Sequence, residues 1–228
     1  LTETAEDTIF SSKPLVDEFG QWIPDDWAGK AKTIGELKTA WNEEEKTLQA
    51  VNSEISKYGG FLGTKAKATG FFRVEKIDEK WWFVDPEGNL FFSTGSCCIN
   101  SRSDLARIKG RENIFTALPP SAEINSANQA KSGKSNSSSY SWNLFRRFGQ
   151  DWYQKWMDLT VQRMDSWGIN TIGNWSDAEL GDSHRKTYVA TIGGWGIETG
   201  IMGMPDVYAP DYAAIVDSAA ARQCARRC

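Results

Sequence analysis

The sequence predicts an α/β domain built on a parallel sheet, and three observations support this fold class. Runs of apolar or small residues that suit buried strands occur at Leu90–Ile99, Asn170–Gly173 and Thr187–Ile192. Helical segments separate these runs, and such alternation is typical of a parallel sheet covered by helices. The run Leu90–Ile99 is almost wholly apolar or small, as expected of a strand buried on both faces. The pattern leaves open whether the sheet is open or closes into a (β/α)8 barrel.

Composition narrows the class of function. The 228 residues are 40% hydrophobic, which is enough to bury a sizeable core. The net charge is −4 and no Lys/Arg-rich segment alternates with aromatic residues, so we expect no nucleic-acid partner. No apolar run approaches about 18 residues, and we expect no membrane span. The 11 Trp residues should mostly pack in the core, but indoles beside amides and carboxylates also suit a sugar site.

Residues 1–32 lack periodicity and are interpreted as an extended lead-in to a long helix. Thr33 and Glu36 have the spacing of a capping box, and apolar residues recur on one face as far as Ile55. We therefore predict a helix over Thr33–Lys57, ended by Gly59-Gly60. The acidic run Glu43-Glu44-Glu45 lies mid-helix and is predicted to form a solvated face.

A β region is predicted after this helix. Two β-rich runs flank Asp78-Glu79, and "DPEG" is a type I turn signal before the run Leu90–Ile99. Two short helical pieces are expected at Asp104–Lys109 and Arg111–Leu118. The polar stretch "NSANQAKSGKSNSSS" predicts a flexible loop near 121–140, with order resuming at Trp142.

The C-terminal half continues the alternation of helix and strand. An amphipathic helix is predicted over Gln150–Trp167, with Gly168 as its stop. A short helix is predicted in "SDAELGDSH" between the second and third strands, and a last helix from Asp211 to Cys228.

Cysteine and histidine usage predicts no metal site. Adjacent Cys97 and Cys98 point to opposite faces of a strand and are interpreted as buried small residues. Cys224 and Cys228 are four residues apart, but the chain has a single His, His184, which is expected to be exposed to solvent. No cofactor is predicted.

Ligands of parallel α/β folds lie at the carboxyl ends of the strands. Amides, carboxylates and indoles follow the three predicted strands and should meet at one rim: Asn100, Arg102, Asn174, Trp175, Asp177, Gly194, Trp195 and Glu198. Such a rim suits a polyhydroxylated substrate. Simpler roles remain open, because Asn174 can cap a turn, the two indoles can pack under loops, and Asp177 or Ser176 can cap the short helix.

Four segments give the chain a family likeness: "LVDEFGQW", "YGGFLGTKAKATGFFRVEKIDEKWWFVDPEGNLFFSTG", "RENIF" followed by "LPP", and "WGINTIGNWSD". Together they resemble the β-agarase-type enzymes of glycoside hydrolase family 50 and their relatives. The resemblance implies a secreted or periplasmic (β/α)8 enzyme that cuts β-1,4 links of agar-type galactans. It implies that residues 1–32 link to a missing N-terminal module, 33–69 form a helix and connection, and 70–228 form the first three β/α units of the barrel.

The resemblance also implies a pair of catalytic glutamates, one of them in an Asn-Glu dipeptide at the end of the fourth strand. The only Asn-Glu here is Asn42-Glu43, inside the predicted helix. We therefore expect no catalytic residue in the chain and no hydrolysis by it alone. The residues expected to contact an agar-type galactan or its oligosaccharides are Asn100, Arg111, Glu112, Asn174, Trp175 and Trp195. The oligomeric state is not predicted.

Two other functions compete with this interpretation. A non-catalytic carbohydrate-binding domain would need an all-β sandwich, which the predicted helices at Thr33–Lys57 and Gln150–Trp167 disfavour. An enzyme that uses carboxylates present in the chain would have to rely on a pair such as Asp177 and Glu198.

Overall fold

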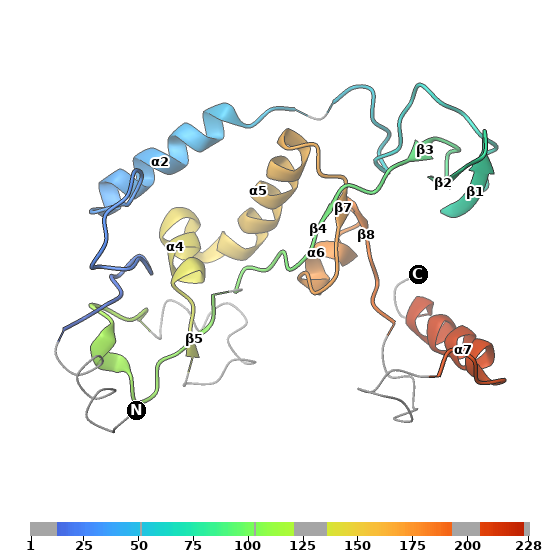
Figure 1. The fold of residues 1–228 in the computed structure, drawn as a ribbon. Helices are drawn as coiled ribbons and strands as arrows, with labels where there is room; N and C mark the ends of the chain where they lie inside the picture. The colour runs from blue at the N-terminus through green and yellow to red at the C-terminus, as the bar shows by residue number, and fades with distance from the viewer. Residues whose placement is uncertain (1–12, 51, 103, 121–135, 193–205, 226–228) are drawn as a thin grey trace.

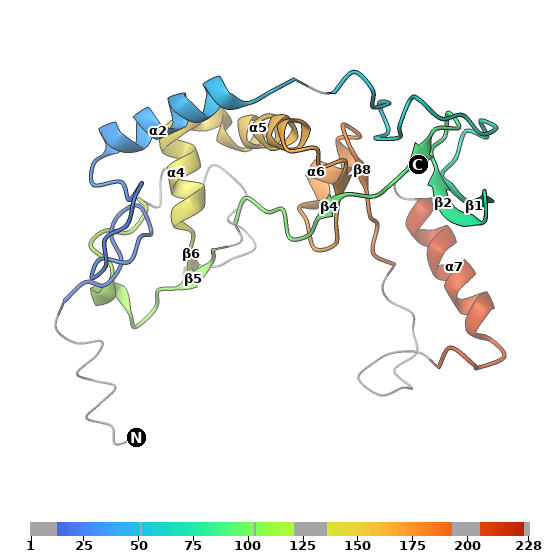
Figure 2. The same cartoon turned by 45° about the horizontal axis from the view of Figure 1, so that its top comes forward.

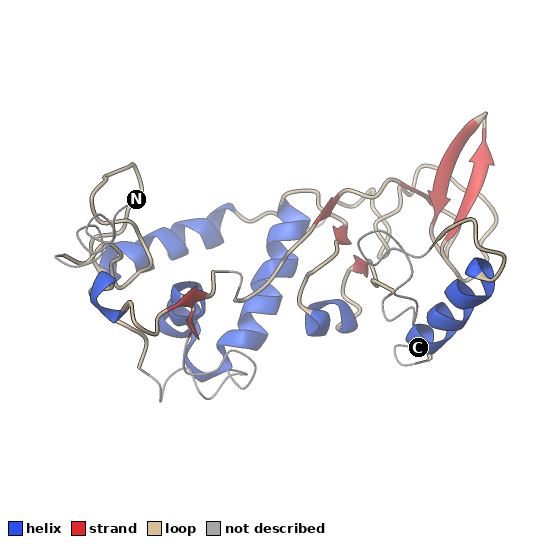
Figure 3. Cartoon of the chain, turned by 60° about the horizontal axis from the view of Figure 1, so that its bottom comes forward, coloured by secondary structure: helices blue, strands red, loops and turns tan. Residues whose placement is uncertain are grey.

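The structure is a computed structural model that describes residues 13–50, 52–102, 104–120, 136–192 and 206–225. Its elements are spread along an elongated arrangement, with α2, α4 and α5 towards one end and the β1–β2 hairpin towards the other (Figure 1). Short parallel strands lie between these two groups (Figure 3). The chain is thus a mixed α/β structure, and its described strands form no closed barrel.

Helix α2, Ile34–Thr47, begins as predicted and ends earlier than predicted. The Thr33 side chain accepts the Glu36 N–H at 3.2 Å, which is the expected N-cap. The predicted extension to Lys57 is wrong, because Leu48 is extended and Asn52 caps a turn, accepting the Glu54 N–H at 3.0 Å. No residue of α2 is buried, so no core contact favours continuing the helix along its apolar stripe.

An antiparallel sheet contains β1, Arg73–Ile77, β2, Lys80–Val84, and β3, Leu90–Phe91, in that order. Asp78 and Glu79 both have positive φ, as a tight two-residue hairpin turn requires. The fully buried Asp85 carboxylate organises the second turn by accepting bonds from Ser56, Glu87 and Asn89. Burial opposes ionisation, but these bonds outweigh it and lower the pKa of Asp85. The hairpin prediction is confirmed.

The parallel sheet consists of β4, Gly95–Ser96, β7, Thr171–Ile172, and β8, Thr187–Tyr188, in the order β4-β7-β8. The predicted strand Leu90–Ile99 is therefore divided between two sheets. Asn170 marks the bend, since its amide donates to Phe92 O at 2.9 Å and accepts the Thr94 N–H at 2.8 Å.

The prediction that Leu90–Ile99 is buried on both faces is wrong. Phe92 is 75% exposed, and Gly95, Cys97 and Cys98 are also exposed. The bend between the sheets removes these residues from any packed layer of the described chain. Cys224 is exposed as well, and Cys228 lies outside the described residues.

The segment between the first two parallel strands contains less helix than predicted. Residues Ala106–Arg107 form strand β5, paired antiparallel with β6, Asn136–Ser137, so the helix expected at Asp104–Lys109 is wrong. Only the 3-10 turn η1, Glu112–Ile114, lies in the second predicted helical piece. Most of the predicted loop, 121–135, lies outside the described residues, and the next described element is β6, which lies before Trp142.

The core forms where the helices meet the parallel sheet. Helix α4, Ser139–Phe148, and the 3-10 turn η3, Gly149–Asp151, lead into α5, Trp152–Ser166, which matches the predicted amphipathic helix. Gly168 ends it with φ +68°. Helices α6, Ala178–Asp182, and α7, Tyr212–Cys224, follow. The core cluster consists of Leu144, Trp152, Trp156, Met157, Met164, Ile172 and Leu180.

Ion pairs join α2 to this core. Glu44 accepts bonds from Arg163 Nε at 2.6 Å and from Arg147 Nη1 at 3.0 Å. Arg147 is only 6% exposed. The predicted solvated face is therefore correct for Glu43, which pairs with Lys46 in solvent, and wrong for Glu44.

None of the described helices has the length and apolar character needed to cross a membrane.

Candidate functional site

The carboxyl ends of β4 and β7 lie side by side and are joined by a series of hydrogen bonds. The Cys98 N–H donates to Asn174 O at 2.8 Å, and the Asp177 N–H donates to Ile99 O at 2.9 Å. The Ile99 N–H donates to Ser176 Oγ at 3.1 Å. A Cβ on Gly173 would come within 2.8 Å of Cys97 Sγ and of Ser96 O, so only glycine permits this approach.

Trp175 stands at this rim. Its indole is 73% exposed and its φ is +58°, which is unusual for a bulky residue. Asn100 Nδ2 donates to Trp175 O at 2.8 Å. The indole face is thus available to a ligand, whereas the donor group of Asn100 is engaged with the backbone.

Asp177 joins the rim to α5 and α6. Its carboxylate caps α6 by accepting the Glu179 N–H at 3.3 Å, and it accepts the Tyr153 hydroxyl at 2.7 Å. Burial and the nearby Asp177 carboxylate raise the pKa of Tyr153 well above its ordinary range, so Tyr153 remains a protonated donor. The N-cap role considered for Asp177 is confirmed.

Two cavities lie beside these residues, and both are lined by Ser176, Asp177 and Ala178. One has a volume of about 270 Å³ and is also lined by Asn100, Arg102, Tyr153 and Glu179. The other, of about 200 Å³, is also lined by Trp175, Tyr188 and Thr191. Amide, hydroxyl, carboxylate and indole groups in this arrangement suit a polyhydroxylated ligand.

The structure brings together only part of the predicted site. Asn100, Asn174 and Trp175 lie at one rim, and Thr191 Oγ1 from the chain after β8 donates to Asn174 Oδ1 at 3.0 Å. Trp195, Gly194 and Glu198 lie outside the described residues.

Arg111 and Glu112 are at η1, away from this rim. Ile114 O in η1 accepts the N–H groups of Leu15 and Val16, and Figure 2 shows this green segment beside the lead-in. Both side chains are exposed, and hydrogen bonds from backbone N–H groups of Glu112 and Gly110 lower the pKa of Glu112.

Tyr153 and Thr191 were not predicted as members of the site. Tyr153 lies in the predicted amphipathic helix Gln150–Trp167, and a tyrosine hydroxyl on the buried face of a helix needs a polar partner, which was the available signal. Nothing in the sequence near Thr191 indicated a role in the site, because its contact with Asn174 depends on the pairing of β7 and β8.

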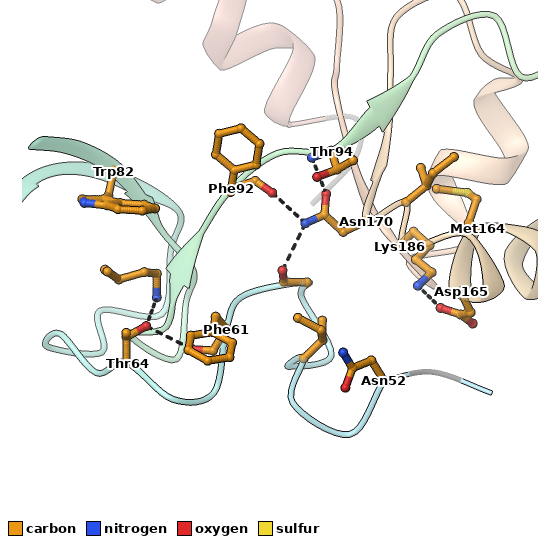
Figure 4. Close-up of a pocket in the computed structure, with 15 residues that line it drawn as sticks. Asn52, Phe61, Thr64, Trp82, Phe92, Thr94, Met164, Asp165, Asn170 and Lys186 are labelled. Carbon is orange, nitrogen blue, oxygen red and sulfur yellow. Dashed lines mark hydrogen bonds and ion pairs between the residues drawn. The ribbon is translucent and has the colours of Figure 1, made fainter. Parts of the chain in front are cut away.

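A larger cavity of about 440 Å³ lies at the opposite, amino ends of the parallel strands (Figure 4). Phe61, Trp82 and Phe92 line it, and the Asn170 amide that faces it is engaged with Gly59 O, Phe92 O and the Thr94 N–H. Its one acidic side chain, Asp165, is paired with Lys186. The described residues that line it include no pair of free carboxylates.

Among the residues that the structure describes, no group of three or more His, Cys, Asp and Glu side chains could hold a metal ion. His184 is exposed, as expected, and its ring lies 6.2 Å from that of Tyr188.

Comparison with known proteins places these features in a class. No family model matches the chain. It is 34% identical over 214 residues to β-agarase B of Vibrio sp. (strain JT0107), covering 79% of this chain and 22% of that protein. It is 30% identical over 203 residues to β-agarase A of the same strain, covering 79% of this chain and 20% of that protein.

Solved structures show the same relationship. The fold matches an agarase, AgWH50C, with a TM-score of 0.72 and 27% identity over 92% of this chain and 35% of that one. It matches PfGH50B with a TM-score of 0.69 and 30% identity over 91% of this chain and 35% of that one. It matches an exo-β-agarase with a TM-score of 0.64 and 28% identity over 77% of this chain and 31% of that one.

The chain is therefore related in sequence and fold to glycoside hydrolases. Within that class its relatives are β-agarases, and the resemblance to the family 50 enzymes is confirmed. The chain spans 22% and 20% of the length of the two Vibrio relatives.

Proposed function

We propose that this chain is part of a glycoside hydrolase that acts on β-1,4 links of agar-type galactans, and that it supplies one wall of the sugar cleft. The observation that carries the proposal is the rim at the ends of β4 and β7, where the largely exposed Trp175 lines one cavity and its neighbours Ser176 and Asp177 also line a second. The β-agarase relatives supply the substrate class.

The proposed architecture is the first three β/α units of a (β/α)8 barrel. Strands β4, β7 and β8 are parallel and are neighbours in the sheet in the order β4-β7-β8, with α4 and α5 between the first two along the chain and α6 between the last two. Strand–helix–strand units of this kind build such barrels. In this arrangement residues 1–32 form a connection to a preceding module. Residues 33–69 form a helix and a connection, and residues 70–228 form the barrel portion.

The proposed cleft wall consists of Trp175, Asn174 and, outside the described residues, Trp195. Each contributes either an apolar face for the C–H groups of a sugar or an amide for its hydroxyls. The position of η1 beside the lead-in does not support the same role for Arg111 and Glu112.

We propose that the catalytic carboxylates come from other parts of the parent protein. Retaining hydrolysis needs two carboxyl groups about 5 Å apart. Glu43 of the Asn42-Glu43 dipeptide is in α2, exposed and paired with Lys46. Asp177, the acidic group considered for a rival mechanism, is engaged with Tyr153 and the N-terminus of α6.

The substrate and its enzyme class also imply a secreted or periplasmic parent. The rival function, a carbohydrate-binding β-sandwich, is disfavoured by α2, α4, α5 and α7, which account for most of the regular structure.

The proposal is tested by mixing the purified chain with agarose oligosaccharides and following tryptophan fluorescence and reducing-sugar release. We expect binding without hydrolysis. Trp175→Ala should weaken binding about tenfold, as expected for loss of a central aromatic contact. Trp81→Ala is the matched control, because Trp81 is 70% exposed but lies in the hairpin.

Two results would contradict the proposal. Equal affinity of Trp175→Ala and the unaltered chain would remove Trp175 from the sugar site. Release of reducing sugar by the pure chain would show that its own carboxylates suffice for catalysis.

A further inference from the structure

Trp175 combines two unfavourable features. Its φ of +58° is in the left-handed region, which bulky residues rarely occupy. The residue is also largely exposed, although it borders a cavity that the apolar side chains of Ile172 and Val189 help to line. Backbone strain of this kind persists only where the surroundings fix the conformation, and it is concentrated at ligand-contacting sites.

The surroundings that fix this conformation come from the end of β4. Each of residues 174–177 is bonded to the segment Cys98–Asn100, through Asn174 O, Trp175 O, Ser176 Oγ and the Asp177 N–H. Three of these four bonds use the backbone of residues 98 and 99. The bond to Trp175 itself is different, because it comes from the Asn100 side chain.

We propose that Asn100 is a positioning residue. Its Nδ2 group holds the Trp175 carbonyl, and thereby keeps the residue left-handed with its indole presented at the rim as a platform for a sugar ring. The identity of the ligand rests on the proposed function. The bond uses one N–H of the Asn100 amide, at 2.8 Å, and the positioning role assigned to it is separate from any contact that the rest of the amide makes with substrate.

The chemistry of this bond explains why an amide is needed. A carbonyl oxygen requires an N–H or O–H donor, and the isosteric aspartate offers only acceptors at neutral pH. Without the donor, the peptide at Trp175 is free to rotate towards an unstrained conformation. The indole then loses its fixed place at the rim even if the fold is intact.

The test uses the full 228-residue chain labelled with 5-fluorotryptophan and observed by fluorine NMR. Spectra of Trp175→Phe and Trp81→Phe assign the two resonances of interest. Without ligand, Asn100→Asp and Asn100→Ala should shift or broaden the Trp175 resonance and leave that of Trp81 unchanged. Asn143→Asp is the matched control, because Asn143 Nδ2 also donates to a backbone carbonyl, that of Phe19, at 3.0 Å.

Titration with an agarose oligosaccharide completes the experiment. We expect the sugar to shift the Trp175 resonance of the unaltered chain, with a Kd about tenfold higher in the Asn100 variants and unchanged in Asn143→Asp. Retained resonances of the other tryptophans confirm that each variant is folded.

The possible results separate the two proposals. An unchanged Trp175 resonance in both Asn100 variants would overturn the positioning role, whatever the sugar does. If the sugar moves no resonance of the unaltered chain, the proposed function fails, while the ligand-free spectra still decide the role of Asn100. The positioning role would also be overturned if Asn143→Asp and Asn100→Asp changed the Trp175 resonance equally. The change would then follow from losing any asparagine amide, and not from losing the bond between Asn100 and Trp175.

Discussion

Single polar side chains hold the backbone at the places where the chain leaves a strand. Asn170 bonds the bend between the two sheets, Asp85 organises a hairpin turn, and Asn100 bonds the strained residue Trp175. In each case a side-chain group satisfies backbone polar groups that the short strands leave unpaired. Backbone strain at a single residue can be tested by comparing the free energies of unfolding of two substitutions at that residue.

The strain at Trp175 predicts an unusual order of stabilities. Because a left-handed backbone costs an L-residue about 1 kcal/mol more than glycine, Trp175→Gly should unfold with a free energy about 1 kcal/mol above that of Trp175→Ala. Chemical denaturation of both variants measures the difference.

Trp81→Gly and Trp81→Ala form the control pair, and we expect the opposite order of their free energies of unfolding. Trp81 lies within β2, where glycine is less favourable than alanine by about 0.5–1 kcal/mol. If Trp175→Gly were no more stable than Trp175→Ala, the positive φ would carry no strain.

Among the elements, α2 differs from α4 and α5 because it buries no residue. Ion pairs attach it to the core. Glu44 bonds Arg147 of α4 and Arg163 of α5, and Glu45 also pairs with Arg147. Partial burial raises the pKa of Glu44, but the bonds from Arg163 and Arg147 outweigh it and lower the pKa below its ordinary value of 4.5.

Glu44→Gln should reduce the free energy of unfolding by about 2 kcal/mol, because it removes charged hydrogen bonds from a largely buried arginine. Glu43→Gln, one residue away in an exposed pair, should change it by less than about 0.5 kcal/mol. Urea denaturation compares the two, and hydrogen exchange in α2 should increase only in Glu44→Gln.

The lowered pKa of Glu44 also sets a pH dependence. A carboxyl whose folded pKa is depressed stabilises the fold fully above its unfolded pKa, here the ordinary value of 4.5, and loses this contribution as the pH falls through the folded value. The stability gap between the unaltered chain and Glu44→Gln should therefore be constant at neutral pH and narrow below about pH 4. If the difference in stability persisted in acid, the ionised Glu44 carboxylate would not be the cause of that difference.

At the scale of the whole molecule, the described chain leaves much apolar surface uncovered. The larger exposed side chains include Phe71, Trp81, Phe83 and Phe92. Within the described residues, β4 and β8 each pair on one side only. Exposed aromatic groups and open sheet edges favour association.

We therefore expect the isolated chain to bind a hydrophobic dye such as ANS and to associate with itself in solution. Dye fluorescence and sedimentation velocity test this. A monomer that binds no dye would contradict it, because the exposed aromatic groups would then have to be covered within the chain.

Local patterns in the sequence determined several features correctly. The Thr33 cap, the turn at Asp78-Glu79, the amphipathic helix α5 and its stop at Gly168 all depend on residues within a few positions of one another. The alternation of strand and helix also placed Asn100, Asn174 and Trp175 at one rim, since parallel strands end at the same edge.

Only the tertiary structure decided where α2 ends, how Leu90–Ile99 is divided between two sheets, and that Cys97 and Cys98 are exposed. It also decided that Asp177 binds Tyr153 and that Asn100 binds the Trp175 carbonyl. The physical reason is that most of these outcomes depend on distant partners, such as Tyr153 for Asp177, 24 residues apart, and Asn170 for Phe92, 78 residues apart. Periodicity reports which face of an element is apolar, but burial and hydrogen bonding depend on what the rest of the chain brings to that face.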